Sequence, residues 1–351
     1  MGKLERIADK LLGRNSNRKA STGGTEDGGK FYSPPGNRYA SAERLKRGLL
    51  EEYRGRDLLS ETEFELVNNN YGETLHLHEP VQKPFTTPNT SPRDILCDLK
   101  LVYGIGYVRE KELKQEGYST IKDLVNHHKW GDKAKSIQEV FQKESLTDAY
   151  RILRRWKTLS DPSFLKLSGL FDREDFAIVD IETMGLSNQP IFLLGLAHPA
   201  GEGVMVHQFL AGDVSQEMAT LAQFSSHLDD LEIILTYNGK NFDIPYIERR
   251  LSYYGNNRKF SHPHLDLYLF TRNILSHGVR DCKLGTIERT ILGVDRDLDI
   301  PSSLVPDFYN TYRESGNPGP LLPILAHNRQ DLLSLVDLFH KLLEETVNGD
   351  T

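Results

Sequence analysis

The chain has 351 residues, of which 38% are hydrophobic and 26% are charged. This balance is typical of a globular protein, and the length allows two domains of the usual ~100–200 residues. The net charge of −7 excludes a chain that is basic throughout, so any surface that binds nucleic acid must be local. The two cysteines, Cys97 and Cys282, form no CxxC pair, which argues against a disulfide framework or a structural zinc site.

No segment has the pattern of a membrane span or a signal peptide. The longest apolar run, residues 191–197, is far below the ~20 residues that a spanning helix needs. The first residues are charged and no apolar stretch follows them, unlike a secretion signal. We therefore expect a cytoplasmic protein without a membrane partner.

The first 40 residues predict little fixed structure. Residues 13–40 are rich in Gly, Ser, Asn and charge, a composition typical of disorder. Before them, apolar residues fall at helical spacing. They predict either a short amphipathic helix that docks on a partner or a frayed terminus; the residues are Leu4, Ile7, Ala8, Leu11 and Leu12.

Residues 41–91 predict an N-terminal extension. Residues 41–54 have the pattern of a basic helix, and FELVNNNYGETLHLHE holds two alternating segments around residues 68–72. That alternation on both sides of a turn predicts a β-hairpin. The proline-rich QKPFTTPNTSPRD, residues 82–94, predicts a linker.

Residues 92–145 carry a glycine-rich turn that resembles a helix-hairpin-helix motif. Gly104 and Gly106 flank Ile105, a helical pattern follows, and a second helix is predicted to start at Ser119. In this motif the glycines let the backbone approach a phosphate, which the amides of the next helix N-terminus bind. The alternative is a plain helical hairpin that only packs. Arg109, Lys111 and Lys114 lie close by and favour binding of a nucleic-acid backbone.

A linker helix, residues 146–172, leads into the last domain, residues 173–347. There the pattern alternates between strand and helix: strands FAIVDI, IFLLGLAH, VMVHQFL, EIILTY and HPHLDLY, with helices near 214–228, 244–254, 283–292, 302–315 and 320–345. This order predicts an α/β fold with a mixed five-stranded sheet flanked by helices, and a mainly helical N-terminal region.

Acidic residues stand at three places in this domain. Asp180 and Glu182 end an apolar strand, and residues two apart in a strand share a face. Two adjacent carboxylates repel each other unless a cation lies between them, and hard oxygen ligands suit Mg²⁺ or Mn²⁺. Asp243 follows the strand that ends near Tyr237; alone, it could be a helix N-cap.

The third place is HNRQD, in which His327 and Asp331 share one face of a helix. A histidine one turn from an aspartate is often a structural pair. Three acidic signals in order make a joint metal site the better interpretation.

The three segments DIET, YNGKNFD and HNRQD resemble, in this order, the exonuclease motifs of the DEDD superfamily, whose fold is ribonuclease-H-like. Residues 146–345 most resemble its YprB-type branch, which includes mitomycin repair factor B. The resemblance implies a 3′→5′ exonuclease that releases 5′-mononucleotides. It uses two Mg²⁺ or Mn²⁺ ions held by Asp180, Glu182, Asp243 and Asp331.

His327 departs from the common pattern of the superfamily. In members of the superfamily that use a catalytic histidine, this histidine usually stands five residues before the last aspartate. In members that use a tyrosine instead, the tyrosine stands four residues before that aspartate. Here the histidine stands four residues before Asp331. This spacing resembles that of the YprB-type branch. Because one residue turns a helical side chain by ~100°, the two positions differ. We expect His327 to be the general base.

The resemblance also implies substrate contacts by Thr183, Met184, Gly185 and Leu186, where the family holds the terminal nucleotide. Leu186 is a candidate wedge against a base or sugar, with ordinary packing as the alternative. Asn238 is a candidate polar contact. Some cations could meet phosphates or be merely solvated: Lys240, Arg249, Arg250 and Lys283.

The expected function is that of an exonuclease acting in DNA repair, with DNA favoured over RNA as the substrate. A helicase is a candidate partner. Three alternatives remain at this point. They are a non-catalytic module that binds nucleic acid or a helicase, an exonuclease that trims RNA 3′ ends, and an endonuclease of the ribonuclease H or resolvase type.

Overall fold

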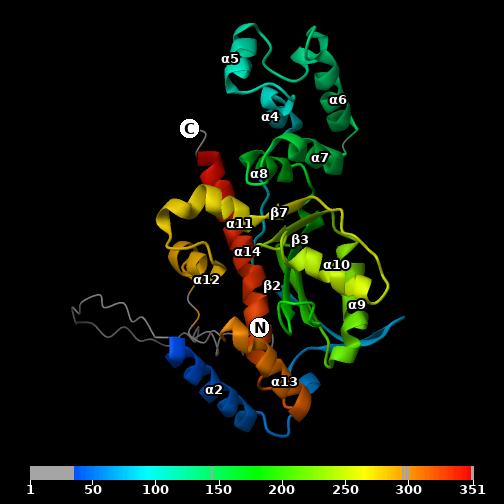
Figure 1. The fold of residues 1–351 in the computed structure, drawn as a ribbon, viewed down its shortest axis with the longest axis vertical. Coiled ribbons are helices and arrows are strands. Elements are labelled where there is room, and N and C mark those ends of the chain that lie inside the picture. Colours follow the sequence, from blue (N-terminus) through cyan, green and yellow to red (C-terminus); the bar gives the residue numbers. More distant parts are fainter. Residues whose placement is uncertain (1–34, 144, 295, 297–299, 349–351) are drawn as a thin grey trace, which may run out of the picture.

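The computed structural model describes residues 35–143, 145–294, 296 and 300–348, drawn in colour in Figure 1. The predicted amphipathic segment 4–12, and the predicted disorder as far as residue 34, lie outside these residues. Helix α2 (Pro35–Glu52) begins earlier than the helix predicted from residue 41. Among the described residues, no helix has the length and apolar character to cross a membrane.

A mixed sheet of seven strands forms the centre of the described chain, in the order β1-β2-β5-β4-β3-β6-β7. Strands β3, β6 and β7 are parallel, and the other neighbours are antiparallel. The α/β prediction is confirmed. The predicted five-stranded sheet corresponds to β3–β7, and the predicted hairpin extends it by two strands at β5. The bounds are β1 (Glu65–Asn69), β2 (Gly72–Val81), β3 (Phe176–Thr183), β4 (Ile191–Ala200), β5 (Gly203–Leu210), β6 (Ile233–Thr236) and β7 (His264–Asp266).

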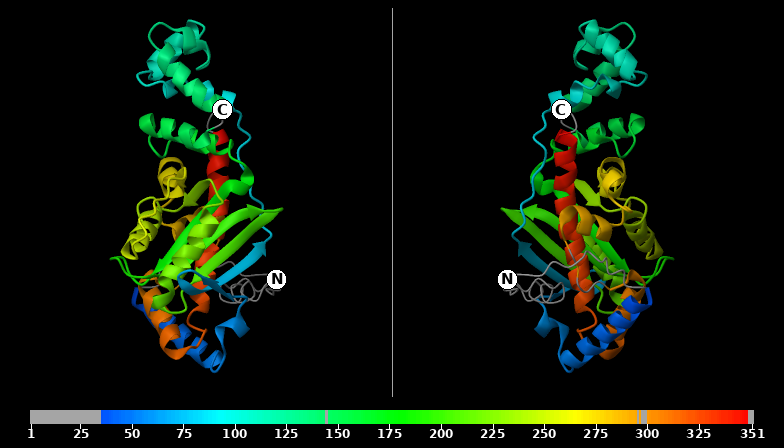
Figure 2. Two further views of the ribbon diagram at one scale, coloured as in Figure 1. Left: turned by 90° about the vertical axis from the view of Figure 1, so that its right-hand side faces the viewer. Right: turned by 90° about the vertical axis from the view of Figure 1, so that its left-hand side faces the viewer.

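Helices cover both faces of the sheet (Figures 1 and 2). Because side chains alternate along a strand, Ile178 packs with α14 (Leu322–Asn348), whereas Val179 packs with α9 (Glu217–Leu228) and α10 (Asp243–Tyr253). The long α14 therefore covers one face, and α9 and α10 cover the other. Shorter segments complete this part: α11 (Leu267–Phe270), the π-helical turns Thr271–Leu275 and Glu288–Leu292, α12 (Leu284–Ile287) and α13 (Val305–Ser315).

The residues of the predicted N-terminal extension pack on the same body. Leu49 of α2, and Tyr53 directly after it, share an apolar cluster with Phe308 of α13 and with the start of α14. Lys46 forms an ion pair with Asp307. A short helix, α3 (Leu58–Glu61), connects α2 to the hairpin. The extension thus completes an edge of the sheet and one end of the helical layer.

Five helices form a module at the top of Figure 1. They are α4 (Pro92–Leu96), α5 (Tyr107–Gln115), α6 (Gly131–Gln142), α7 (Leu146–Trp156) and α8 (Pro162–Ser168). The helix predicted from Ser119 is only a 3₁₀ turn, Asp123–Asn126. There the carboxylate of Asp123 accepts from the amides of Ser119 and Thr120, at 3.0 and 2.8 Å, which favours a turn.

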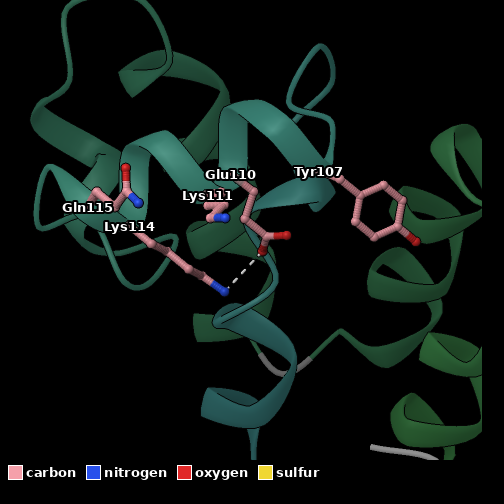
Figure 3. A pocket seen from close by; sticks show the side chains of 5 residues that line it. All are labelled: Tyr107, Glu110, Lys111, Lys114 and Gln115. Carbon is pink, nitrogen blue, oxygen red and sulfur yellow. Dashed lines mark ion pairs between the residues drawn. The ribbon is translucent and has the colours of Figure 1, made fainter.

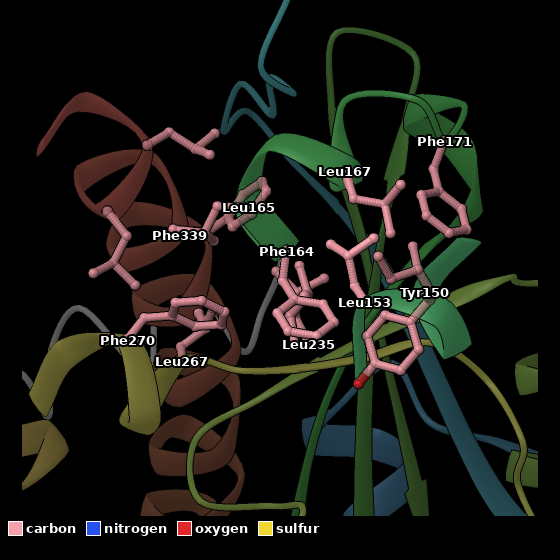
Figure 4. Packing of buried hydrophobic residues seen from close by; sticks show 14 of the residues in the cluster. Tyr150, Leu153, Phe164, Leu165, Leu167, Phe171, Leu235, Leu267, Phe270 and Phe339 are labelled. Carbon is pink, nitrogen blue, oxygen red and sulfur yellow. The ribbon is translucent and has the colours of Figure 1, made fainter. Parts of the chain in front are cut away.

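One apolar core joins this module to the sheet. Leu153 of α7 and Phe164 of α8 pack between the module and a group that includes Leu235 of β6 and Phe339 of α14 (Figure 4). The hydroxyl of Tyr150 donates to the carbonyl of His264 in β7, at 2.8 Å. The module is therefore fixed to the end of the sheet where β7 lies.

Candidate active site

Asp180 lies near the end of β3, beside Gly195 of β4. The side-chain amide of Asn328, on α14, donates to Oδ2 of Asp180 at 2.8 Å. A Cβ on Gly195 would stand 2.5 Å from Oδ1 of Asn328, so only glycine leaves room for this contact. The small residue on β4 thus lets α14 reach the carboxylate on β3.

The orientation of Asn328 is fixed from its other side. Gln208 of β5 donates through Nε2 to Oδ1 of Asn328 and to the carbonyl of Leu325, both at 2.9 Å. Since Oδ1 accepts there, Nδ2 must face Asp180. Three elements, β3, β5 and α14, therefore set the position of one carboxylate oxygen.

Asp243 is the first residue of α10, and Phe242 occupies the N-cap position, so the N-cap interpretation of Asp243 is wrong. The loop before it is held by the buried carboxylate of Asp266 at the end of β7. This carboxylate accepts from the amides of Asn238 and Lys240, at 2.7 and 3.2 Å. Asn238 has a positive φ of 62°, which asparagine tolerates better than most residues.

Two of the acidic residues, Asp180 and Asp243, have raised pKa values. Burial, and then the charges of Asp331, Asp243 and Glu182, raise the pKa of Asp180 well above its usual value. Burial, with the charges of Asp266 and Glu182, raises the pKa of Asp243 to about 7. Residues from β3, α10 and α14 are therefore close enough to penalise one another's negative charge.

His327 and Asp331 form the third part of the cluster, on α14. His327 Nε2 lies 3.3 Å from Oδ2 of Asp331, as the spacing of four predicts. Arg296 joins them: its guanidinium forms an ion pair with Asp331, and its Nη1 lies 2.9 Å from Nδ1 of His327. Because arginine only donates, Nδ1 of His327 accepts and its proton is on Nε2.

Arg296 also forms an ion pair with Glu288, which is almost completely buried. The two carboxylates raise the pKa of Arg296, although its burial acts in the opposite direction. A fixed cation already compensates Asp331 and Glu288, whereas Asp180 and Asp243 have no such ion pair among the described residues. This uneven neutralisation fits a site that takes a divalent cation beside β3, since the donors are hard carboxylate oxygens.

The loop after β3 presents the expected substrate residues. Leu186 is 79% exposed, so ordinary packing does not explain it. The hydroxyl of Thr183 donates to the carbonyl of Gly185 at 3.0 Å, and Tyr246 of α10 donates to the same carbonyl at 2.7 Å. Met184 is partly buried against the cluster that contains Leu193. The loop is thus anchored at its base and exposed at its tip.

Of the cations proposed to meet phosphates, Arg250 has an internal role. It is buried and forms an ion pair with the buried Glu217 at 2.6 Å. It also donates to the carbonyl of Asn188 at 2.8 Å. Arg250 therefore holds the 184–190 loop in place, and the prediction that Arg250 meets a phosphate is wrong.

Gly104 and Gly106 directly precede α5, and α5 stands in the helical module, apart from the sheet (Figure 1). Gly104 has a φ of 94°, and a Cβ there would meet the ring of Trp130 at 3.2 Å. Gly106 is the N-cap residue of α5 and has open space around its Cα. Ile105 between them is buried, so the turn exposes glycine backbone at a helix N-terminus.

Sequence reasoning missed several residues of this site, among them Gly195, Gln208, Asp266, Glu288, Arg296 and Asn328. Asp266 had a usable signal, because it is an acidic residue within the last predicted strand, HPHLDLY. Arg296 and Glu288 had none, since they lie outside every motif and reach the site through the packing of α12 and the following segment.

Comparison with known proteins agrees with this geometry. Residues 177–343 match the family model described as RNase_H superfamily. Together with the strand order, this match shows that the C-terminal part of the chain has a ribonuclease-H-like α/β fold.

The chain is also 30% identical over 211 residues to the uncharacterized protein YprB of Bacillus subtilis (strain 168), which covers 58% of this chain and 51% of that protein. The chain therefore spans about half the length of this curated relative. Among solved structures, it is similar to the family B DNA polymerase from the hyperthermophilic archaeon Pyrobaculum calidifontis. That match has a TM-score of 0.38 and 20% identity, over 48% of this chain and 24% of that one.

Proposed function

We propose that the ribonuclease-H-like domain is a metal-dependent 3′→5′ exonuclease that acts on DNA. The observation that carries this proposal is the convergence of Asp180, Glu182, Asp243 and Asp331, from three elements, beside His327. The mutual effect of these carboxylates on the pKa of Asp180 supports it. Grouping acidic side chains costs stability, so their shared chemistry gives the best reason for it.

The four carboxylates would hold two Mg²⁺ or Mn²⁺ ions. When bound, such a pair supplies an activated water nucleophile and stabilises the charge of the leaving 3′ oxygen. The contact from Asn328 directs the carboxylate of Asp180, as partners of metal ligands usually do.

His327 would accept the proton of the attacking water. Its unperturbed pKa of ~6.5 suits this role near neutral pH. In the described structure, Nδ1 of His327 accepts from Arg296 and Nε2 faces Asp331. A nitrogen must be released from one of these partners before it can accept a proton. Because Nε2 carries the ring proton, we propose that Nδ1 is the accepting nitrogen, which becomes available when Arg296 moves away from it.

The exposed tip of the 184–190 loop supports an end-directed reaction. Leu186 would contact the terminal base or sugar, while Thr183, Met184 and Gly185 shape the loop beneath it. Asn238 would offer a polar side chain from the opposite loop. These residues would hold a chain end, and this favours exonuclease over endonuclease activity.

The helical module would bind the DNA backbone. Gly104 and Gly106 expose backbone at the N-terminus of α5, which suits a phosphate. Figure 3 shows Lys111 and Lys114 on the same helix, along a hollow of about 390 Å³. Such contacts position DNA without reading its sequence. The resemblance to the YprB-type branch favours a setting in DNA repair, with a helicase as a possible partner.

The test is degradation of a 3′-labelled oligonucleotide with Mn²⁺ by the full chain. Asp180→Ala and Asp331→Ala should each abolish it. Asp337→Asn is the matched control, because this carboxylate lies on α14 but pairs with Lys83. Undiminished degradation by either alanine variant would sink the assignment of the site.

His327→Ala tests the base separately. It should lower kcat by about 10²–10⁴-fold, the usual contribution of a general base, while Mn²⁺ binding remains. Loss of Mn²⁺ binding would instead make His327 a ligand.

The second candidate is a non-catalytic module that binds nucleic acid. The ion pairs of Arg296 with Asp331 and Glu288 favour it, because a fixed cation already compensates part of the acidic cluster. A titration with Mn²⁺ separates the two, since a non-catalytic domain should bind this ion weakly. A matched set of single-stranded DNA, duplex DNA and RNA then separates DNA processing from RNA trimming.

A further inference from the structure

Five histidines gather on the sheet face opposite to the one that carries Asp180. His207 of β5 packs near Phe209 and His227 on the face that α9 covers. The next residue, Gln208, instead donates to α14 on the other face. The sheet therefore separates this cluster from the candidate active site. The five are His76 and His78 on β2, His198 on β4, His207 on β5 and His227 in the last turn of α9.

Three of these histidines have the spacing of a metal site. One ring nitrogen from each of His76, His207 and His227 lies within 4.8 Å of the other two. Nε2 of His76 and Nδ1 of His207 are 3.0 Å apart. In a tetrahedral zinc site with Zn–N bonds of ~2.0–2.1 Å, ligand nitrogens stand about 3.3 Å apart. Small side-chain movements would suffice to close this group around an ion.

Hydrogen bonds to backbone carbonyls show which ring nitrogen of His227 and of His198 carries the proton and which has a lone pair. Nδ1 of His227 lies 3.0 Å from the carbonyl of Gln223, and Nδ1 of His198 lies 3.1 Å from that of Pro199. A carbonyl only accepts, so each Nδ1 carries the proton and each Nε2 has a lone pair.

The same reasoning reaches His207. Its Nε2 lies 3.2 Å from Nε2 of His198, which has the lone pair, so Nε2 of His207 donates. Nδ1 of His207 therefore has its lone pair toward His76. Ligand histidines usually donate their other ring N–H to a partner that orients them, and His207 and His227 already do so. Only His76 must move its proton from Nε2 to Nδ1.

The charge state of the cluster suits a metal ligand. Burial, and then the neighbouring histidines, lower the pKa of His76 to about 4 and that of His207 to about 2. These imidazoles are neutral at pH 7, and no proton has to be displaced from a charged ring before binding.

We propose that His76, His207 and His227 bind one divalent transition-metal ion of the zinc class, with His198 as a positioning residue for His207. Imidazole nitrogen suits Zn²⁺ and its late transition-metal neighbours, not Mg²⁺. The site would join β2, β5 and α9, and so fasten the N-terminal hairpin to the ribonuclease-H-like sheet. The cysteine spacing that argued against structural zinc does not bear on an all-histidine site.

The test is zinc binding by the full chain with Asp180→Ala and Asp331→Ala, so that the carboxylates cannot compete. After treatment with a chelator, this parent should take up one Zn²⁺ per chain in competition with a chromophoric chelator. His76→Ala and His227→Ala should each weaken binding by more than about 100-fold. His198→Ala should weaken it by about 10–100-fold, the usual cost of losing a partner of a ligand. His128→Ala, an exposed histidine of the helical module, is the matched control.

A thermal melt adds a readout that does not depend on stoichiometry. Zn²⁺ should raise the Tm of the parent and of the His128→Ala control, but not that of the folded His227→Ala variant, since an ion stabilises the state that binds it. Zinc uptake that is equal in His227→Ala and the parent would overturn the proposal. So would a folded parent that binds no Zn²⁺. Neither result affects the nuclease proposal, which rests on the other face.

Discussion

At the scale of single residues, Asp180 occupies a position where its negative charge lowers the stability of the folded chain. Its carboxylate is surrounded by three others and receives only one hydrogen bond that is described, from Asn328. Without a cation, its negative charge is therefore unfavourable in the folded chain. The same environment would favour a divalent ion beside this carboxylate.

We predict that Asp180→Asn stabilises the chelator-treated chain at pH 8. The substitution keeps the oxygen that Asn328 meets and removes one negative charge from a cluster that raises the pKa of Asp180. Urea denaturation with and without Mn²⁺ measures this. Mn²⁺ should stabilise the natural chain and not the variant. A variant less stable than the natural chain in chelator would contradict the account.

Arg296 is the residue that changes the interpretation of the site most. The sequence predicted Asp331 and His327 as a pair, and the structure makes them a triad with a buried guanidinium. No spacing rule could reveal this, because Arg296 reaches α14 from a segment 31 residues before His327. The chemistry of the carboxylates was readable from the chain, but their internal counter-charge was not.

At the scale of elements, the contact between β4 and α14 depends on one glycine. We predict that Gly195→Ala lowers kcat by about 10–100-fold, because it displaces Asn328 and hence Asp180, and a misplacement of about 1 Å can cost 10²-fold. It should also cost about 1–3 kcal/mol of stability, as overpacking usually does. Gly48→Ala in α2, where a Cβ meets open space, is the control. Full activity in Gly195→Ala would refute this role of β4.

Strand β7 carries a histidine that should make the fold sensitive to acid. His264 is buried, and Thr236 Oγ1 lies 2.8 Å from its Nε2. Burial, and then the charge of Lys240, lower its pKa to about 3. The unfolded chain, with a pKa near 6.5, binds the proton more readily. Stability due to His264 is therefore present above pH ~6.5 and is lost as the pH falls toward 3.

We predict that His264→Gln flattens this dependence. Between pH 8 and pH 5 the natural chain should lose about 2 kcal/mol more than the variant, at ~1.4 kcal/mol per pH unit. Urea denaturation at both pH values measures the difference. His277→Gln, at an exposed histidine, should keep the slope of the natural chain. If the free energy of unfolding changed equally with pH in His264→Gln and in the natural chain, burial in β7 would not disfavour protonation of His264.

The strands illustrate what the sequence could and could not predict. Alternation and apolar runs predicted each of the seven strands, and the DIET motif fixed the face that Asp180 and Glu182 share. The pairing of β2 with β5 was not predictable, because nothing in the hairpin specifies a partner more than 120 residues away. The histidine cluster forms because β2 pairs with β5, so no local sequence pattern could predict it.

At the scale of the whole molecule, the helical module stands at one end of the body that holds the sheet (Figure 2). A continuous apolar core through α7 and α8 connects them. A DNA strand bound at α5 would therefore keep a fixed relation to the sheet, which is the arrangement that repeated trimming of one strand requires.

We predict that Gly106→Val weakens DNA binding by about 10-fold or more while the fold remains intact. Its φ of −102° and the open space around it accept a side chain, which would then block a phosphate from the amides of α5. Hydrolysis of a dinucleotide, which is too short to reach α5, should be unchanged. Unaltered binding of long DNA would assign the glycine turn to packing alone.

We propose that the site formed by Asp180, Glu182, Asp243 and Asp331 hydrolyses DNA from its 3′ end. The most direct measurement follows one 5′-labelled single strand with Mn²⁺, in linear form and closed into a circle. The account predicts a ladder that shortens from the 3′ end, release of 5′-mononucleotides, an intact circle, and no reaction with Asp180→Asn. An opened circle, or a ladder that Asp180→Asn still produces, would contradict it.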